Sequence, residues 1–305
     1  MQSPIDLESL RLFVRVSSLG TLSEAAREAG VSQQAVSARM SALESRLGVA
    51  LLYRTPHGTR LTDAGTLVAG LAMPLLDEAD RFASVTRALR STGETSIRIA
   101  ASLTIAEHLA PGWLIALHER QPAIRIQLAA ANSDDVSELV RSGSADIGFI
   151  ETPEIPDDLE HETFATDELV VVVGSAHPWA RRRSGITIDE LAATPVIARE
   201  RGSGTRLAFE QGLDRSGHPP VDPAFELSTT AAIRSTVAAG QAPAVLSILA
   251  VRDQIASGSL VKVKLRELRI VRPLVVVWRA DIPPRSAVAD ALLTIVRGAP
   301  SPSPG

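Results

Sequence analysis

The sequence contains no cysteine, and this absence excludes several classes of function at once. Without thiols the chain can form no disulfide bond, thiolate metal site or iron–sulfur cluster, and it cannot sense redox state through cysteine. The six histidines form no ligand pair at helical spacing. We therefore expect neither a bound metal nor a cofactor.

Long hydrophobic runs are also missing. The longest apolar stretches, such as residues 169–173 and 274–278, have the length of strands. They fall far short of the roughly 18–20 residues needed to span a bilayer. The first residues, Met-Gln-Ser-Pro-Ile-Asp, lack the basic start and apolar segment of a secretory signal. We expect a cytoplasmic protein that does not enter a membrane.

The acidic net charge of −4 argues against nucleic-acid binding when it is taken over all 305 residues, but the charge is unevenly distributed. A chain of this length is expected to form about two domains. Residues 1–90 hold ten arginines against nine acidic residues, and the stretch 39–60 holds four arginines against one glutamate. A local basic patch, doubled in a dimer, suits a contact with DNA.

Three short helices are predicted near the N-terminus, at residues 7–18, 22–29 and 33–47. Each follows a side chain that can cap it, namely Asp6, Thr21 and Ser32. Thr21 and Glu24 have the spacing of a capping box. Glycines at positions 20, 30 and 48 end the helices. The second and third helices, joined by a short turn with glycine, form a helix-turn-helix.

The third helix has two contrasting faces. Val36, Met40, Leu43 and Leu47 form an inward apolar stripe. The opposite face carries only small or polar side chains, as a helix entering a DNA major groove requires. A plain three-helix bundle with a solvated polar face explains this pattern equally well. The following segment favours DNA binding, because residues 50–54, 55–59 and 60–62 have the pattern of a strand, a turn and a returning strand. Such a hairpin is the wing of a winged helix-turn-helix.

Taken in order, the segments Thr21–Ala29, Val31–Ser37, Leu43-Glu44, Leu47-Gly48, Leu52–Arg54 and Leu61–Gly65 resemble the DNA-binding signature of the LysR family of bacterial transcriptional regulators. The resemblance implies a dimer or tetramer on double-stranded operator DNA. It places the third helix in the major groove and the wing beside the minor groove. The residues expected to contact DNA are Ser32, Gln33, Gln34, Ser37, Ala38, Arg39, Ser41, Arg54 and Arg60.

Two positions depart from the family's pattern. Ala38 stands where many members have arginine, and Arg39 stands where many have glutamine. Arg39 lies near the inner edge of the helix, so it is expected to reach a phosphate instead of a base. The operator preference of other members is therefore not carried over.

Residues 63–92 are predicted to form a linker helix that dimerises. Leu67, Leu71, Leu75, Phe82 and Leu89 fall on one stripe with the spacing of a coiled-coil seam. Pro74 should kink this helix. Packing of the stripe on its own domain is the alternative. We favour a dimer, because the three-helix core is already satisfied and the stripe would otherwise be exposed.

From residue 93 to 298, strands and helices alternate, which predicts open parallel α/β sheets. Helices are expected at 105–121, 135–142, 188–193, 205–211, 230–239 and 285–297. Strands are expected at 97–101, 124–130, 145–150, 168–174, 195–198, 224–227, 243–246 and 274–278. The fold class is α/β overall, with a mainly α winged domain at 1–62. The resemblance implies two lobes like those of periplasmic binding proteins: lobe I at 93–165 and 270–298, lobe II at 166–269. Residues 299–305 are expected to be a disordered tail.

Three loops of this domain are expected to meet at a small-molecule effector between the lobes, because ligands bind at the carboxyl ends of parallel strands. They contain Ser102 and Thr104, then Asn132, then Ser203 and Thr205. Hydroxyl groups and free N–H groups at helix starts suit an anionic effector. The alternative is that these residues only cap helices. Glu151 and Thr229 are further candidate effector residues.

Other classes of function fit the sequence less well. An enzyme is disfavoured, because the chain contains no Gly-x-Ser-x-Gly, no Walker-type phosphate loop and no His-Glu-x-x-His. A transport binding protein would have a signal peptide and no winged helix. A molybdate-type regulator would need a small β-barrel. We expect an allosteric transcription factor, with RNA polymerase as a further candidate partner.

Overall fold

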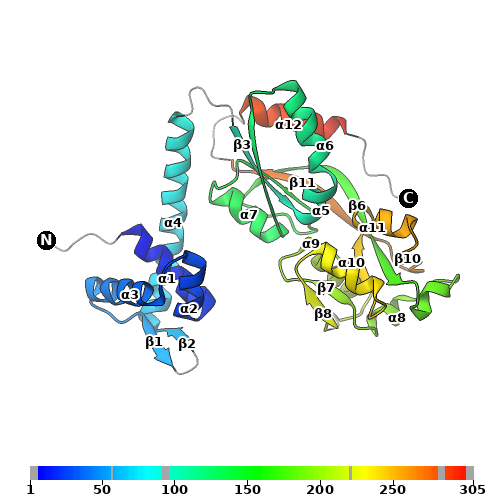
Figure 1. Ribbon diagram of the computed structural model, residues 1–305, viewed down its shortest axis with the longest axis horizontal. Coiled ribbons are helices and arrows are strands. Elements are labelled where there is room, and N and C mark those ends of the chain that lie inside the picture. Colours follow the sequence, from blue (N-terminus) through cyan, green and yellow to red (C-terminus); the bar gives the residue numbers. More distant parts are fainter. Residues whose placement is uncertain (1–5, 56–57, 91–95, 220–221, 281–285, 300–305) are drawn as a thin grey trace. The chain divides into compact units, whose positions relative to one another are not determined.

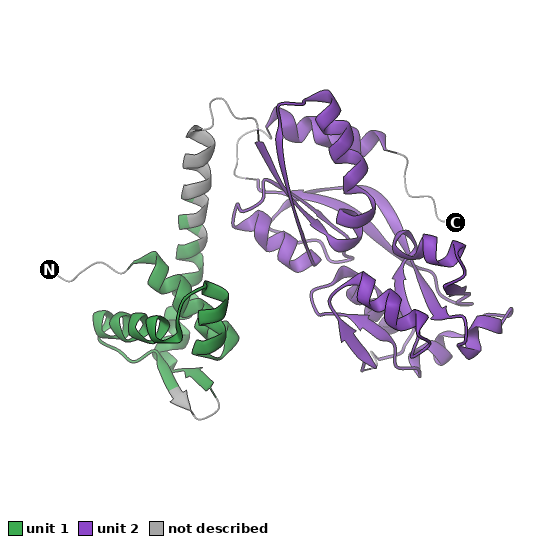
Figure 2. Ribbon diagram, in the orientation of Figure 1, with its two compact units in different colours: residues 1–90 green, residues 91–305 purple. Residues whose placement is uncertain are grey.

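The computed structural model describes residues 6–55, 58–90, 96–219, 222–280 and 286–299. By its internal contacts the chain divides into two compact units, residues 1–90 and 91–305 (Figure 2). Some side chains at the tip of the wing and in the linker helix lie outside the described part, including those of Arg54 and Leu89.

The first unit begins with the three predicted helices, which the structure confirms. They are α1 (Leu7–Leu19), α2 (Leu22–Ala29) and α3 (Gln33–Leu47). Asp6, Thr21 and Ser32 each accept a hydrogen bond from the backbone N–H three residues later, at 2.8, 3.2 and 3.2 Å. The predicted capping box of Thr21 and Glu24 forms in part, because its second hydrogen bond joins two side chains. The Glu24 carboxylate accepts from the Thr21 hydroxyl at 3.0 Å. The local sequence therefore sets where each helix starts.

The wing consists of the antiparallel strands β1 (Leu52–Thr55) and β2 (Gly58–Leu61). Glu44 on α3 holds its base, since its carboxylate accepts from the N–H groups of Leu51 and Leu52 at 2.8 and 3.1 Å. Thr59 donates from its backbone to the Gly20 carbonyl at 2.7 Å. A Cβ atom at Gly58, whose φ is +136°, would lie 2.7 Å from that carbonyl oxygen, so this approach requires glycine.

The linker helix is α4 (Asp63–Arg90), which continues through Pro74. Thr62 caps it, accepting from the Gly65 N–H at 2.8 Å. Ala69, Ala72 and Leu76 on α4 are buried in the same core as α1 and α3. One face of the first half of α4 therefore belongs to the winged domain.

The second unit is built on one mixed sheet, with strand order β4-β3-β5-β11-β6-β9-β7-β8 and with β10 also paired to β6. The strands are β3 (Ser96–Ser102), β4 (Arg125–Ala131), β5 (Ile147–Ile150), β6 (Glu160–Gly174), β7 (Ile197–Arg199), β8 (Phe225–Leu227), β9 (Ala244–Ser247), β10 (Leu260–Val263) and β11 (Ile270–Trp278).

Two long strands join the lobes (Figure 1). β11 runs antiparallel to β6 from Glu160↔Trp278 to Leu169↔Ile270, with a shift in register between Leu274 and Val275, and the last residues of β6 pair with β10. In lobe I, β11 continues onto β5 and the parallel strands β3 and β4. In lobe II, β6 continues onto β9 and the parallel strands β7 and β8. The predicted parallel strands are present in each lobe, whereas the crossover strands β6 and β11 are antiparallel to their neighbours.

Helices cover the faces of both lobes. Lobe I carries α5 (Leu103–His108), α6 (Ala110–Arg120), α7 (Ser133–Arg141) and α12 (Ala287–Gly298). Lobe II carries the 3-10 turn η1 (Pro178–Arg181) and the helices α8 (Ile188–Ala192), α9 (Gly204–Arg215), α10 (Thr230–Ala238) and α11 (Ile248–Ala256). In lobe I, α6 and α12 pack on one face of the sheet and α7 on the other (Figure 1).

Several predicted boundaries are wrong for identifiable reasons. The helix expected at 105–121 is broken at Leu109 into α5 and α6, because Pro111 lacks an N–H and disfavours helical continuation before it. The strand expected from residue 168 begins at Glu160, in a polar stretch without the apolar signal of its second half. Two further elements, α11 and β10, were not predicted from the sequence. In the described part of the chain, no helix is long and apolar enough to cross a membrane.

Candidate functional site

The outer face of α3 is exposed and free of large apolar side chains. Its inner stripe packs in the core of the first unit, with Val36, Met40 and Leu43 buried. Ser37 is half-buried. The other residues predicted to contact DNA from this region are exposed: Ser32, Gln33, Gln34, Ala38, Arg39 and Ser41. The exposed members of this face therefore take no part in the buried core.

Two contacts orient this face. Ser23 on α2 donates from its hydroxyl to the Gln33 carboxamide oxygen at 3.0 Å, which fixes that side chain at the start of α3. Arg46, farther along the helix, pairs with Asp6 at 3.1 Å. Arg39 makes no ion pair with any described residue, so its charge remains available for a phosphate.

The wing presents Arg60 on β2, where it is exposed and paired in register with Tyr53 on β1. Tyr53 is 61% exposed. The prediction for Arg54 falls on a side chain outside the described part of the chain. The structure therefore brings α3 and Arg60 into one small domain but leaves Arg54 undescribed.

The apolar stripe of the linker helix is exposed within the single chain. Leu67, Leu71, Leu75 and Phe82 are 66%, 65%, 51% and 70% exposed. The buried face of α4 is made instead by Ala69, Ala72 and Leu76. Leu67, Leu71 and Leu75 are thus not buried by their own domain, which disfavours the alternative for this part of the stripe. Leu89, the fifth residue predicted for the stripe, has a side chain outside the described part.

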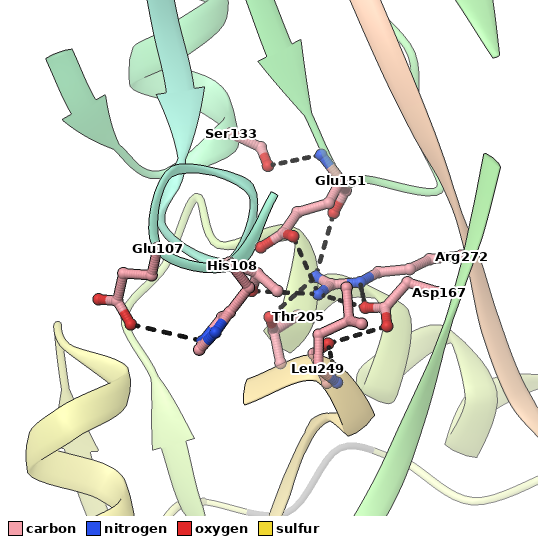
Figure 3. Close-up of polar contacts among 10 residues, drawn as sticks. Glu107, His108, Ser133, Glu151, Asp167, Thr205, Leu249 and Arg272 are labelled. Carbon is pink, nitrogen blue, oxygen red and sulfur yellow. Dashed lines mark hydrogen bonds and ion pairs between the residues drawn. The ribbon is translucent and has the colours of Figure 1, made fainter. Parts of the chain in front are cut away.

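A buried ionic cluster lies where the two lobes meet, centred on Arg272 of β11 (Figure 3). Its guanidinium donates from Nε and a terminal nitrogen to Asp167 on β6 at 2.9 and 2.8 Å. The same group lies 3.2 Å from the Glu151 carboxylate, which directly follows β5. These charges are almost inaccessible to solvent, so the ion pairs are desolvated and must be satisfied by their mutual geometry.

Hydroxyl groups from both lobes complete the cluster. Thr205 at the start of α9 accepts from Arg272 at 2.8 Å, and Thr104 on α5 accepts at the outer limit of 3.5 Å. Ser247, at the end of β9, donates to the other Asp167 oxygen at 2.8 Å. The predicted effector residues Thr104, Glu151 and Thr205 are therefore brought together on one arginine.

The loop before α9 also contacts lobe I. The Asp134 N–H donates to the Gly202 carbonyl at 3.3 Å, and a Cβ atom at Gly204 would lie only 1.9 Å from the Glu151 carbonyl oxygen. Gly204 is required by this approach of the two backbones. The loop before α9 therefore lies directly against lobe I.

The remaining predicted effector residues differ in what they do. Asn132 caps α7 by accepting from Asp135 at 2.8 Å, and Thr229 caps α10 at 3.3 Å and is exposed. Thr229 takes no part in the hydrogen bonds of the ionic cluster. Ser102 and Ser203 are buried at helix starts. Both residues stand at N-cap positions, but neither hydroxyl group makes the hydrogen bond that an N-cap side chain usually makes.

Arg272, Asp167 and Ser247 are residues of the candidate site that were not predicted from the sequence. A usable signal existed for Arg272, since it interrupts the otherwise apolar strand Ile270–Trp278, and a charge in such a strand is buried only when it is paired. Asp167 and Ser247 stand at the borders of apolar runs, where sequence alone does not distinguish a surface position from a buried one. Among the described residues, no group of histidine and acidic side chains could hold a metal ion.

Comparison with known proteins relates both units to one family. The model of the bacterial regulatory helix-turn-helix protein, lysR family, matches residues 7–66, and the model of the LysR substrate binding domain matches residues 90–300. This chain belongs to the LysR family. An uncharacterized HTH-type transcriptional regulator of Mycobacterium bovis is 41% identical to this LysR-type regulator over 298 residues, covering 94% of this chain and 95% of the relative. The resemblance inferred from residues 21–65 is confirmed.

Solved structures agree on the fold of this LysR-type regulator. The Synechocystis PCC6803 CcmR regulatory domain in complex with 2-PG is 26% identical with a TM-score of 0.61, covering 67% of this chain and 97% of that domain. Full-length CbnR in complex with its target DNA is 21% identical with a TM-score of 0.57, covering 96% of this chain and 99% of that chain. This regulator is thus a DNA-binding transcription factor with an effector-binding domain, and its relatives are regulators rather than enzymes.

Proposed function

We propose that this LysR-type regulator binds its operator through the exposed face of α3, dimerises along α4 and responds to a small anionic effector held between its lobes. The observation that carries this proposal is the division of α3 into a buried apolar stripe and an exposed face of small and polar side chains. The exposed side chains do not contribute to the hydrophobic core, and they can pair with the hydrogen-bond donors and acceptors of base edges.

The side chains on and near α3 have different proposed roles. Gln34 and Ser37 lie one turn apart and would read base edges, while Ala38 allows close approach to a thymine methyl group. Ser32, Gln33 and Ser41 flank them. Arg39, Arg54 and Arg60 would neutralise phosphates, which supplies affinity without reading sequence.

The dimer follows from the exposed stripe of α4. Leu67, Leu71, Leu75 and Phe82 are each more than half exposed, and a continuous apolar stripe of this kind is a protein-interaction surface. Leu89 would extend the stripe. Two such helices give a homodimer, and further contacts between effector domains would give a homotetramer. RNA polymerase is a further candidate partner.

The effector site is proposed around the ionic cluster. The starts of α7 and α9 lie close together, since the Asp134 N–H donates to the Gly202 carbonyl. The positive ends of the two helix dipoles, with Ser102 and Ser203 nearby, would favour an anionic group. Asn132 and Thr229 are the outer members of this set. The 2-PG complex of the CcmR regulatory domain supports a small-molecule effector. Binding at this point would shift the balance between lobe arrangements.

The test is a mobility shift with purified full-length protein and the DNA upstream of its own gene at about 0.15 M salt. We expect saturable binding that the double variant Gln34→Ala/Ser37→Ala weakens by about 10- to 100-fold, while unrelated DNA binds the two proteins alike. The assignment of α3 would be refuted if both proteins bound all DNA sequences alike and a genome-wide selection enriched no fragment.

A further inference from the structure

Two buried polar atoms at the proposed effector site have no hydrogen-bond partner among the described residues: Ser102 Oγ and Glu151 Oε2. Glu151 Oε2 has only the ion-pair contact of 3.2 Å with Arg272. Ser102 ends β3 and Glu151 follows β5, and these parallel neighbours pair at Ala101↔Phe149, so both residues lie at the same edge of the sheet. Buried polar atoms without partners commonly mark the place of a water molecule or a ligand.

The charges around Glu151 do not balance. Two carboxylates, Asp167 and Glu151, share the single guanidinium of Arg272, and Asp167 accepts two of its hydrogen bonds. Arg199 on β7, the next cation facing Glu151, is already bound by both oxygens of Glu200. With both carboxylates ionised, this buried cluster is left with a surplus negative charge.

The cationic side chains of the neighbouring helices do not offset this surplus. His108 on α5 lies 3.6 Å from Glu107 (Figure 3), and burial lowers the pKa of its ring, which disfavours the cationic form. Arg206 on α9 pairs with Glu210 and Glu226. Burial raises the pKa of the Glu151 carboxyl, and Arg272 and the Thr104 hydroxyl only partly oppose this shift. An anionic oxygen that approaches Glu151 therefore meets a like charge, and two such groups cannot both stay ionised at hydrogen-bonding distance.

We infer that the bound effector shares one proton with Glu151, so that the site selects weak-acid oxyanions, which carry a proton near neutral pH, over oxyanions that stay fully ionised. The inference rests on the proposed function, since it assumes an anionic effector between the lobes. Glu151 is then a specificity-determining residue, and Ser102 Oγ is an additional hydrogen-bonding group for the same ligand.

Hydrogen phosphate and sulfate make a matched pair of probes. Both are tetrahedral dianions of similar size near pH 8, but only hydrogen phosphate has a hydroxyl group that can donate to Glu151 Oε2. Sulfate can bind only when Glu151 itself takes a proton from solvent. The structure therefore favours phosphate over sulfate, and the preference should grow as the pH rises.

The experiment is isothermal titration calorimetry of the full-length protein with inorganic phosphate and with sulfate between pH 6 and 8.5. At pH 8 we expect phosphate to bind at least about tenfold more tightly than sulfate. Sulfate affinity should fall by about tenfold per pH unit where Glu151 is ionised in the free protein, because one proton is taken up on binding. These measurements on the unmodified protein need no variant.

Glu151→Gln sharpens the test, because an amide N–H₂ can donate to either ion without a proton. In this variant the preference for phosphate should shrink to about threefold or less, and the pH dependence of sulfate binding should disappear. Glu107→Gln, which removes a partly exposed carboxylate on α5, is the matched control and should behave like the unmodified protein. Circular dichroism and operator binding check that both variants fold.

Equal affinity for the two ions, preference for sulfate, or sulfate binding without pH dependence in the unmodified protein would each overturn the inference. Failure of both ions to bind would also overturn it, since no oxyanion would then be held beside Glu151. In all these cases the mobility shift with the Gln34→Ala/Ser37→Ala control reports separately on the proposed DNA-binding function.

Discussion

The two proposed sites of this regulator are built in opposite ways. The proposed DNA-binding face lies within residues 32–41, and its side chains are exposed apart from the half-buried Ser37. The proposed effector site draws Thr104, Glu151, Asp167, Thr205, Ser247 and Arg272 from separate segments and buries them. Substitutions on the exposed face should therefore change DNA specificity with little effect on stability. Substitutions in the buried cluster should change both the response to ligand and the stability of the fold.

Removing the central arginine should have the largest effect. Arg272→Met leaves Asp167 and Glu151 buried and unpaired, and we expect the free energy of unfolding of the second unit to fall by about 3–5 kcal/mol. The three tryptophans, Trp113, Trp179 and Trp278, all lie in this unit. Their fluorescence in urea therefore follows its unfolding without a contribution from the winged domain.

The control for this prediction is Arg269→Ala, next to the same strand. Arg269 pairs with Glu168 at 2.9 Å but is largely exposed, so its loss should cost less than about 1 kcal/mol. Equal effects of the two substitutions would show that burial does not distinguish these ion pairs.

Breaking the exposed stripe of α4 should have the next largest effect, on assembly. Leu71→Asp places a charge on the proposed seam, and we expect a shift from dimer to monomer in analytical ultracentrifugation. Operator affinity should fall by about a hundredfold, because two linked half-site contacts become one. Thr66→Asp, on α4 but off the stripe, should remain a dimer. A dimeric Leu71→Asp protein would refute the seam.

The pH dependence of stability tests the environment of Glu151. Burial raises the pKa of this carboxyl from its ordinary value of 4.5. Because the folded pKa lies above the unfolded one, the stability linked to this group is fully present below the unfolded pKa and is lost as the pH rises through the folded pKa. The free energy of unfolding of Glu151→Gln should therefore increase relative to the unmodified protein as the pH rises from 4.5.

This difference should grow by at most about 1.4 kcal/mol per pH unit within that window. Thermal unfolding followed by tryptophan fluorescence measures it, with Glu107→Gln as the matched control. A difference that stays constant from pH 4.5 to 8 would contradict the raised pKa.

The smallest effect is expected at Arg39. Arg39→Ala should reduce the slope of log affinity against log salt by about 1, as for the loss of one phosphate contact, without changing the preferred DNA sequence. Arg46→Ala is the comparison on the same helix, because Arg46 is already paired with Asp6. It should leave the salt slope unchanged. A change in preferred sequence with Arg39→Ala would instead assign that side chain to base reading.

The winged domain and the family could both be predicted from the amino-acid sequence alone. Caps at Asp6, Thr21 and Ser32 and glycines after each helix are local signals, acting over three or four residues, and α1, α2 and α3 begin and end where they indicate. The alternation of α3 between apolar and polar faces is local in the same sense. These features can be predicted from the sequence because both partners of each interaction lie close together in the chain.

The proposed effector site depends on contacts that form only in the folded protein. Glu160–Asp167 has no apolar alternation, yet it forms half of β6 because β11, more than a hundred residues later, pairs with it. Arg272 meets Asp167, Glu151 and Thr205 for the same reason. Sequence patterns report a residue's neighbours along the chain, whereas the burial and charge balance that give this site its chemistry are set by strands that meet only in the folded protein.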